Sequence, residues 1–287
     1  MNRADYQQKI IQYYKDTEHA YKDSWDLGKS LAIHYGYRDD KARDFRSSLQ
    51  RMNEVMAETA GITSADHVLD AGCGVGGSSI FLATTIGCTV KGITLSDRQV
   101  QQANTNAETR GVSGKVSFEV ADYCRTPFPD GSFDVVWACE SSCYADDKAL
   151  FVKEAYRLLK PGGRLVVADG FVTKFENNEN PVISKWLEGW QVNYLESPER
   201  FADYMKGEGF GSIKYRDISI QTAASSKRLY RFYFLAMCYV WWRKLFMRKR
   251  PTDMQQKNID ACKYQYQGMK KGWWQYGLIV GTKSPVN

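Results

Sequence analysis

The chain has few of the residues that build metal sites, and its cysteines form no regular set. Its 287 residues include three histidines and seven cysteines. Cys139 and Cys143 have no second cysteine or histidine pair at metal-ligand spacing, which argues against an all-protein zinc site. The cysteines are odd in number and scattered, and the N-terminal segment is charged from Arg3 onward. We therefore expect no secretory leader and a reducing, cytoplasmic location.

Long apolar runs, internal repeats and low-complexity linkers are also missing. The longest apolar run, residues 230–242, is interrupted by Arg231. It is shorter than the roughly 20 residues that cross a bilayer, so it predicts a buried or interfacial helix. What the chain does have is 43% hydrophobic and 14% aromatic residues, enough for a substantial core.

The net charge of +6 is modest, and much of it falls late in the chain, at 227–228, 243–244 and 248–250. This pattern favours an anionic substrate or membrane surface over a general nucleic-acid coat, with a solvated basic face as the alternative. The chain also lacks an Asn-Pro-Pro-Tyr-like tetrad. We expect a hydrophobic small-molecule substrate and no nucleic acid, while peripheral membrane contact and homo-oligomerisation stay open.

Hydrophobic spacing divides the chain into four parts. Residues 1–60 have helical periodicity and predict an N-terminal helical cap. Residues 61–222 alternate short apolar strands with helical segments, which predicts a mostly parallel sheet with helices on both faces. Residues 223–272 predict an aromatic and basic helical insertion that covers the substrate, and residues 273–287 predict the last of seven strands.

A glycine-rich turn follows the first predicted strand. Residues 68–77 read VLDAGCGVGG, with Gly72, Gly74 and Gly76 at alternate positions ahead of a helix. Glycines there let the backbone turn tightly and approach a ligand at a helix N-terminus. Asp70 precedes them, and its carboxylate would favour a cationic ligand over a pyrophosphate. The turn therefore points to S-adenosylmethionine rather than NAD.

Four motifs in order resemble those of class I S-adenosylmethionine-dependent methyltransferases. They are VLDAGCGVGG (68–77), GITLSDRQV (92–100), VADYCRTPFPDGSFDVVW (120–137) and LLKPGGRLVVADG (158–170). The resemblance implies a Rossmann-like α/β fold and S-adenosylmethionine as cofactor. GITLSxxQ and the aromatic segment 12–37 are similar to the branch that contains tocopherol, sterol and cyclopropane-fatty-acid methyltransferases.

The resemblance also implies roles for individual residues. Gly72, Gly74 and Gly76 line the amino-acid part of the cofactor, and Asp122 with the backbone of Tyr123 meets the adenine. Many relatives hold the ribose with an acid, and here Thr94, Leu95 and Gln99 stand in its place. The alternative for Thr94 and Gln99 is that they only form the start of a helix, with side chains in solvent. The residues implied to close over the methionine end are Tyr14, Trp25, His34 and Tyr35. Simple packing between helices is the alternative for Trp25.

Glu140 stands at the end of a predicted buried strand, 133–138. Ligands of open parallel sheets bind outside the carboxyl ends of the strands, which places Glu140 beside the transferred methyl group. Glu140-Ser-x-x-Tyr144 and the tail 268–283 resemble methyltransferases that methylate carbon of a prenyl diphosphate. We expect Glu140, a cofactor contact as well, to accept a proton from a carbocation with Tyr144 assisting. The alternative is that Glu140 only binds backbone or caps the next helix.

These features predict C-methylation of an isoprenoid alkene, such as geranyl or farnesyl diphosphate, with cyclisation left open. Aromatic faces stabilise a cation, and arginines or lysines bind phosphates. The predicted substrate contacts are Arg38, Trp186, Trp190, Lys227, Arg228, Tyr230, Arg231 and Tyr233. The pairs Asp39-Asp40 and Asp146-Asp147 lack a third aspartate at terpene-synthase spacing, so we expect no protein metal site. Mg²⁺ carried by a diphosphate stays open.

Two other functions remain compatible with the sequence. One is N- or O-methylation of a hydrophobic small molecule (a tocopherol-like phenol, quinone, sterol or alkaloid), with Glu140 or Tyr144 as general base. The other is a non-catalytic cofactor-binding or membrane-peripheral protein, suggested by the basic aromatic segment.

Overall fold

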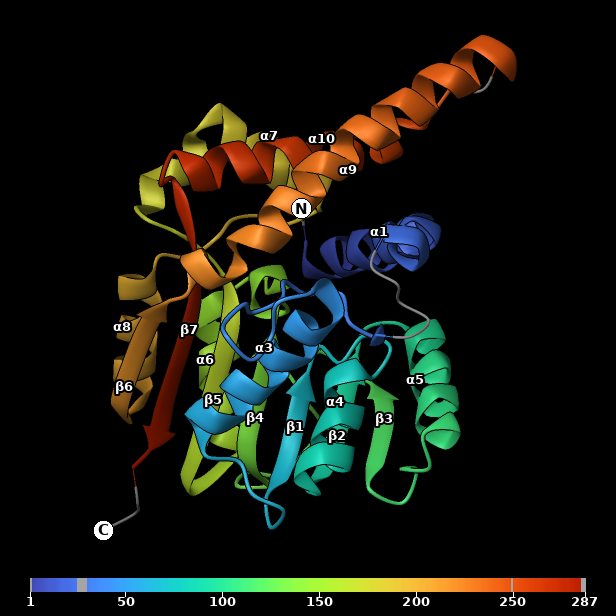
Figure 1. Ribbon diagram of the computed structural model, residues 1–287. Coiled ribbons are helices and arrows are strands. Elements are labelled where there is room, and N and C mark those ends of the chain that lie inside the picture. The colour runs from blue at the N-terminus through green and yellow to red at the C-terminus, as the bar shows by residue number, and fades with distance from the viewer. Residues whose placement is uncertain (1, 25–29, 249, 285–287) are drawn as a thin grey trace.

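The fold is built on one seven-stranded sheet (Figure 1). The structure is a computed structural model that describes residues 2–24, 30–248 and 250–284, without the side chains of 18–24. The strands are β1 (His67–Ala71), β2 (Thr89–Thr94), β3 (Val116–Val120), β4 (Phe133–Cys139), β5 (Leu159–Val172), β6 (Phe210–Asp217) and β7 (Trp274–Lys283). Their order is β3-β2-β1-β4-β5-β7-β6; β7 runs antiparallel to β5 and β6, and the other pairs are parallel. The predicted mostly parallel, Rossmann-like sheet is confirmed.

Helices cover both faces of the sheet, because its central strands are apolar on both sides. On one face lie α3 (Phe45–Ala60), α4 (Gly77–Phe81) with the π-helical turn η1 (Leu82–Ile86), and α5 (Asp97–Thr109). On the other lie α6 (Lys148–Leu158) and α8 (Pro198–Glu208). Short 3₁₀ turns, η2 (Ser142–Tyr144) and η3 (Phe175–Glu179), follow β4 and β5.

Helix α3 lies in the core rather than in the predicted N-terminal cap. Its apolar side, which includes Leu49, Met52 and Met56, is buried against the sheet. Asp44 caps its start by accepting a bond from the Ser47 N–H, and Gly61 ends it at φ 59°. The periodicity of residues 1–60 predicted helices correctly, but an apolar stripe does not reveal which surface will cover it.

A second layer of helices lies beyond the carboxyl ends of the parallel strands (Figure 1). It consists of α1 (Arg3–Ser24), α7 (Pro181–Gly189), α9 (Ser219–Phe246) and α10 (Asp253–Lys270). Helices α9 and α10 form the predicted insertion before the last strand, although α9 begins at Ser219 rather than at 223. None of the helices in the described ranges is long and apolar enough to cross a membrane.

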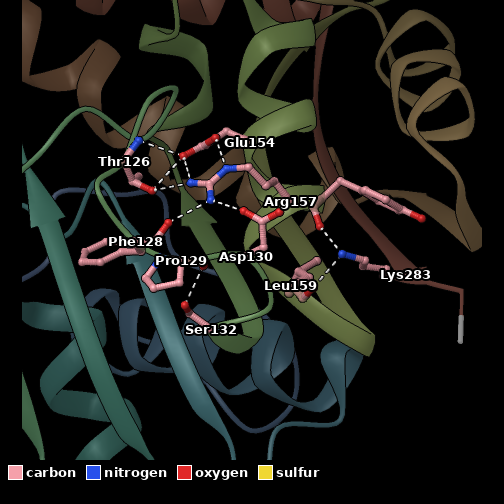
Figure 2. Close-up of polar contacts among 10 residues, drawn as sticks. Thr126, Phe128, Pro129, Asp130, Ser132, Glu154, Arg157, Leu159 and Lys283 are labelled. Carbon is pink, nitrogen blue, oxygen red and sulfur yellow. Dashed lines mark hydrogen bonds and ion pairs between the residues drawn. The ribbon is translucent and has the colours of Figure 1, made fainter. Parts of the chain in front are cut away.

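A polar network at the far end of the sheet holds the start of β4 in place (Figure 2). Arg157 donates hydrogen bonds to Glu154, to Asp130 and to the Phe128 carbonyl. Glu154 in turn accepts bonds from the N–H and hydroxyl of Thr126. These contacts tie the loop that leads into β4 to α6, at the end of β4 opposite Glu140.

Candidate functional site

Two cavities meet at the carboxyl ends of the strands. A smaller one, about 110 Å³, lies between the glycine turn, the end of β2 and α1. A larger one, about 740 Å³, lies between α1, α7, α9, α10 and the start of β7. Four residues line both: Tyr14, Ile33, Glu140 and Tyr144. A ligand in the smaller cavity and one in the larger cavity would therefore touch at Glu140 and Tyr144.

The glycine turn forms one wall of the smaller cavity. Gly72 (φ 100°) and Gly74 (φ 52°) both line it, and a Cβ on Gly74 would project into open space. A side chain on Gly72 would clash with Ser141. Gly76, predicted to line the cofactor, is not among the lining residues. It is the N-cap of α4 at φ 87°, where a Cβ would come within 2.9 Å of the Phe118 ring, so packing accounts for that glycine.

The acid and the ribose-site residues predicted from sequence lie in the same cavity. Asp70 accepts a 2.6 Å hydrogen bond from the Ser79 hydroxyl, and burial raises its pKa to about 6. The Thr94 hydroxyl donates to Gln99 Oε1 at 2.6 Å. Leu95 and Gln99 also line an adjoining cavity of about 470 Å³ that extends between α1 and α5. The smaller cavity therefore continues past the end of β2.

Asp122 lies outside this cavity, unlike the neighbouring Tyr123. Its carboxylate accepts hydrogen bonds from Arg3 and Gln7 at 2.9 and 2.7 Å, and from the Cys124 N–H. The start of α1 thus binds the Asp122 carboxylate, which was predicted to meet the adenine. Asp122 follows the end of β3 at Val120, and its contact with the adenine stays a prediction.

Among the residues predicted at the methionine end, Tyr14 and His34 line the smaller cavity. His34 is buried, its Nδ1 lies 3.0 Å from the Tyr35 carbonyl oxygen, and burial lowers its pKa. A neutral ring that donates from Nδ1 leaves Nε2 as an acceptor, and Nε2 has no partner within the described structure. Tyr35 lines only the larger cavity. Trp25 lies outside the described residues.

Glu140 is placed at the junction by an uncommon backbone conformation, φ 48°. Its Oε1 accepts hydrogen bonds from the backbone N–H of Tyr35 and, at 2.7 Å, from the Tyr276 hydroxyl. Burial raises the pKa of Glu140 to about 8, although the two hydrogen bonds act to lower it. The carboxyl group is therefore held in a fixed position with a pKa near neutrality, which suits proton transfer.

Tyr276 is a site residue that sequence reasoning missed. It is buried on β7, lines the larger cavity and binds Glu140. Because β7 runs antiparallel to β5, its first residues lie at the same edge as the carboxyl ends of the parallel strands. The sequence carries no signal for the direction of the last strand, so it could not locate Tyr276.

Aromatic rings dominate the inner part of the larger cavity. Trp186, Trp190 and Tyr233 line it as predicted, together with Trp274. The rings of Trp186 and Trp274 lie 4.5 Å apart, and those of Trp186 and Trp190 lie 5.5 Å apart at a steep angle. The face of α9 that lines the cavity consists of Leu229, Phe232, Tyr233, Leu235, Ala236, Tyr239, Val240 and Arg243.

The other predicted substrate contacts do not line this cavity. Arg38, Lys227 and Arg231 are exposed, while Arg228 lies between the rings of Phe45 and Phe232. Tyr230 stacks on Tyr266 with ring centres 4.5 Å apart. The helical phase of α9 explains this arrangement, because positions 229, 232, 233 and 236 face the cavity and 227, 230 and 231 do not.

Arg243 is the one lysine or arginine among the described lining residues. It lies on the last turn of α9, and sequence had noted it only as part of the late basic charge. Asp16 of α1 also lines the cavity. Within the described ranges, no three histidine, cysteine, aspartate or glutamate side chains are grouped to hold a metal ion.

The groups that line the smaller cavity and the adjoining one suit the parts of S-adenosylmethionine. Gly74 leaves room for a ligand against the backbone, His34 Nε2 is an unused acceptor, and Asp70 and Glu140 have pKa values that a nearby cation would lower. Thr94 and Gln99 supply hydroxyl and amide groups for a sugar. These groups suit a ligand with positive charge and a ribose.

Known proteins with similar sequences are methyltransferases. Residues 69–167 match the family described as "Methyltransferase domain". The chain is 29% identical to the chloroplastic tocopherol O-methyltransferase of Arabidopsis thaliana, across 96% of this chain and 81% of that protein. It is 33% identical to methyltransferase GfsG of Streptomyces halstedii, across 66% of this chain and 69% of that protein.

Solved structures share the fold over almost the whole chain. The [4+2]-cyclase SpnF superposes with a TM-score of 0.77 at 22% identity, covering 97% of this chain and 96% of that one. Geranyl diphosphate C-methyltransferase from Streptomyces coelicolor A3(2), solved with Mg²⁺, geranyl diphosphate and S-adenosyl-L-homocysteine, superposes with a TM-score of 0.74 at 21% identity, covering 97% of each chain. These similarities agree with the predicted fold.

Proposed function

The chain belongs to the S-adenosylmethionine-dependent methyltransferases, and on that premise we propose that it methylates an alkene carbon of an isoprenoid. The observation that carries the proposal is the junction of the two cavities. An aromatic cavity meets the cofactor cavity at Glu140, a buried carboxyl group with a pKa near neutrality.

Gly72, Gly74, Thr94 and Gln99 would hold the cofactor, with Asp70 and His34 nearby. When bound, S-adenosylmethionine supplies an electrophilic methyl group, and an alkene that accepts it is left as a carbocation.

The inner part of the larger cavity, next to Glu140, suits such a cation. Aromatic rings attract positive charge without being nucleophilic, and an apolar lining excludes the water that would trap the cation. Trp186, Trp190, Trp274 and Tyr276 provide these rings close to the junction. The same surroundings would tolerate rearrangement or cyclisation before the charge is lost.

Glu140 would complete the reaction by accepting a proton from a carbon next to the cation, which restores an alkene one methylene unit heavier. Only its ionised form can do so, and the positive charge of a bound cofactor favours that form. The Tyr276 hydroxyl and the Tyr35 N–H hold the carboxylate in place. Tyr144 lines both cavities and would assist by closing the junction.

The outer part of the larger cavity, which runs along α9, would hold the rest of the substrate. Its lining on α9 extends from Leu229 to Arg243, or about 21 Å at 1.5 Å per residue. An extended isoprenoid chain fits that shape. Arg243 at the outer end would bind an anionic group such as a diphosphate, with which Mg²⁺ would enter. A structural neighbour that binds geranyl diphosphate supports this substrate class.

A second candidate is O-methylation of a prenylated phenol. The pKa of Glu140 near 8 suits a general base for a phenol, whose pKa is about 10. A tocopherol O-methyltransferase that aligns with 96% of this chain also favours it.

The test is mass spectrometry of products formed from methyl-deuterated S-adenosylmethionine. Acceptors are geranyl, farnesyl and geranylgeranyl diphosphate, with and without Mg²⁺, and a tocopherol-like phenol. We expect a deuteromethylated hydrocarbon chain from one diphosphate. Glu140→Gln should lower kcat by about 10²–10⁴-fold with cofactor affinity retained, since general base catalysis contributes that much. Glu176→Gln, on an exposed turn, is the matched control.

Methylation of the phenol alone would select the second candidate. Cofactor binding with no methylated product from any of these acceptors would contradict both.

A further inference from the structure

We propose that the outer half of α9 binds the surface of an anionic lipid bilayer and presents the mouth of the larger cavity to it. Binding to the bilayer is independent of the proposed reaction, whereas uptake of an isoprenoid from it rests on the proposed function.

The first observation is a contiguous apolar surface on α9. Two rows at helical spacing run along the outer half: Phe234, Trp241 and Leu245 in one, and Leu235, Tyr239, Trp242 and Phe246 in the other. All seven side chains are exposed; Trp241 is 64% and Phe246 66% exposed. The rows are neighbours on one face, because their members differ by one position. We call these seven residues the apolar face of α9.

The apolar face projects from the body of the protein. Figure 1 shows α9 extending past the rest of the helical layer, with the start of α10 beneath it. Ring contacts order the second row: Tyr239 stacks on Trp242, and Trp242 contacts Phe246 at 5.9 Å. Folded proteins rarely leave so large an apolar surface in water without a partner.

The second observation is the charge around this face. From Ser219 to Thr252 the sequence contains eight lysines and arginines and no aspartate or glutamate. Lys244, Arg248 and Arg250 are exposed at the outer end, and Arg231 is exposed at the inner end. Tryptophan and tyrosine beside arginine and lysine are typical of helices that lie in a membrane interface, and the basic residues complement anionic lipid head groups.

The third observation links this face to the cavity. Leu235 and Tyr239 belong to the apolar face and also line the larger cavity. The mouth of the cavity therefore opens beside the apolar face. A protein docked through that face would take up an isoprenoid whose hydrocarbon chain lies in the apolar interior of the bilayer.

The test is flotation of the full chain with vesicles of phosphatidylcholine, with and without phosphatidylglycerol, at low and at high salt. We expect binding to the anionic vesicles that weakens at high salt, because screening removes the charge attraction. The double variant Trp241→Glu/Leu245→Glu should lose at least about tenfold in vesicle binding. Neither residue lines the cavity, so methyl transfer to a detergent-dispersed substrate should persist.

The matched control is Ile220→Glu, which places the same charge on an apolar residue of α9 that is 88% exposed but far from the apolar face. It should bind vesicles like the wild type. Circular dichroism and cofactor binding check that each variant folds.

Equal binding by the wild type and the double variant, or no binding by either, would overturn the proposal. Light scattering that shows a wild-type dimer, a monomeric double variant and no vesicle binding would instead assign the apolar face to a second copy of the chain.

Discussion

At the scale of single residues, the site depends on the buried carboxyl group of Glu140, whose hydrogen bonds only partly replace the water it has lost. Glu140 receives two hydrogen bonds on one oxygen, yet burial still raises its pKa from 4.5 to about 8. Desolvation therefore outweighs the two bonds. A group in this state costs stability when ionised and gains reactivity from the same cause, since a less solvated carboxylate is a better proton acceptor.

The raised pKa predicts a pH-dependent effect on stability. Between pH 4.5 and 8 the folded protein holds a proton on Glu140 that the unfolded chain has lost, so the free energy of unfolding falls as pH rises. Glu140→Gln removes this dependence while keeping an acceptor oxygen. The melting temperature of the variant, measured by differential scanning fluorimetry, should exceed the wild type's by more at pH 8 than at pH 5. If the melting temperatures of Glu140→Gln and the wild type changed in parallel with pH, the raised pKa would be contradicted. The control Glu176→Gln should change in parallel with the wild type.

At the scale of elements, the strand-turn-helix unit β1-α4 builds one wall of the smaller cavity, the proposed cofactor site. Asp70 ends the strand, Gly72 and Gly74 turn with positive φ, and Gly76 caps the helix. A side chain is excluded at each glycine for a different reason. Gly72 contacts Ser141, Gly74 faces the cavity and Gly76 packs on Phe118. Alternate glycines in a sequence do not distinguish these roles.

Gly74→Ala and Gly111→Ala form a matched pair that tests the element. Both glycines have positive φ and open space where a Cβ would lie, but Gly111 is remote from the cavities. Alanine in this conformation costs about 1 kcal/mol, so both variants should lose similar stability in urea unfolding. Only Gly74→Ala should weaken cofactor binding, by about tenfold or more in titration calorimetry, because its methyl group enters the cavity. Equal affinities in the two variants would exclude Gly74 from the cofactor site.

At the scale of the whole molecule, the larger cavity joins segments that are distant in sequence. Tyr14 of α1, Trp186 of α7, Ile259 of α10 and Tyr276 of β7 all line it. A buried network also crosses these parts: Gln265 accepts bonds from the hydroxyls of Tyr35 and Ser226. The shape of the cavity, and with it substrate length, is therefore a property of how the helical layer sits on the sheet.

The position of Ala236 on α9 predicts control of substrate length. Ala236→Phe places a ring about halfway along the cavity and should lower kcat/KM for the longest accepted isoprenoid by about tenfold. The shortest substrate, which needs only the inner cavity, should stay within about threefold. Cys238→Phe on the exposed side of the same helix is the control. A uniform loss across chain lengths in the product assay would contradict this arrangement.

The sequence by itself determined the fold class, and it named residues that line one cavity. Period-two and period-3.6 patterns identify strands and helices because burial follows those periods. Gly72 and Gly74 follow β1, Thr94 ends the paired strand β2 and Gln99 follows it, and all four line the smaller cavity. Glu140 was located by the same logic, as the first residue past a buried strand.

Only the tertiary structure decided which side chains complete the site. Tyr276 reaches Glu140 through an antiparallel last strand, Arg3 binds Asp122 from the other end of the chain, and the phase of α9 turns Arg243 toward the cavity and Arg231 away. The physical reason is that local periodicity reports that a face will be buried, whereas the partner of that face depends on contacts between segments that are distant in sequence.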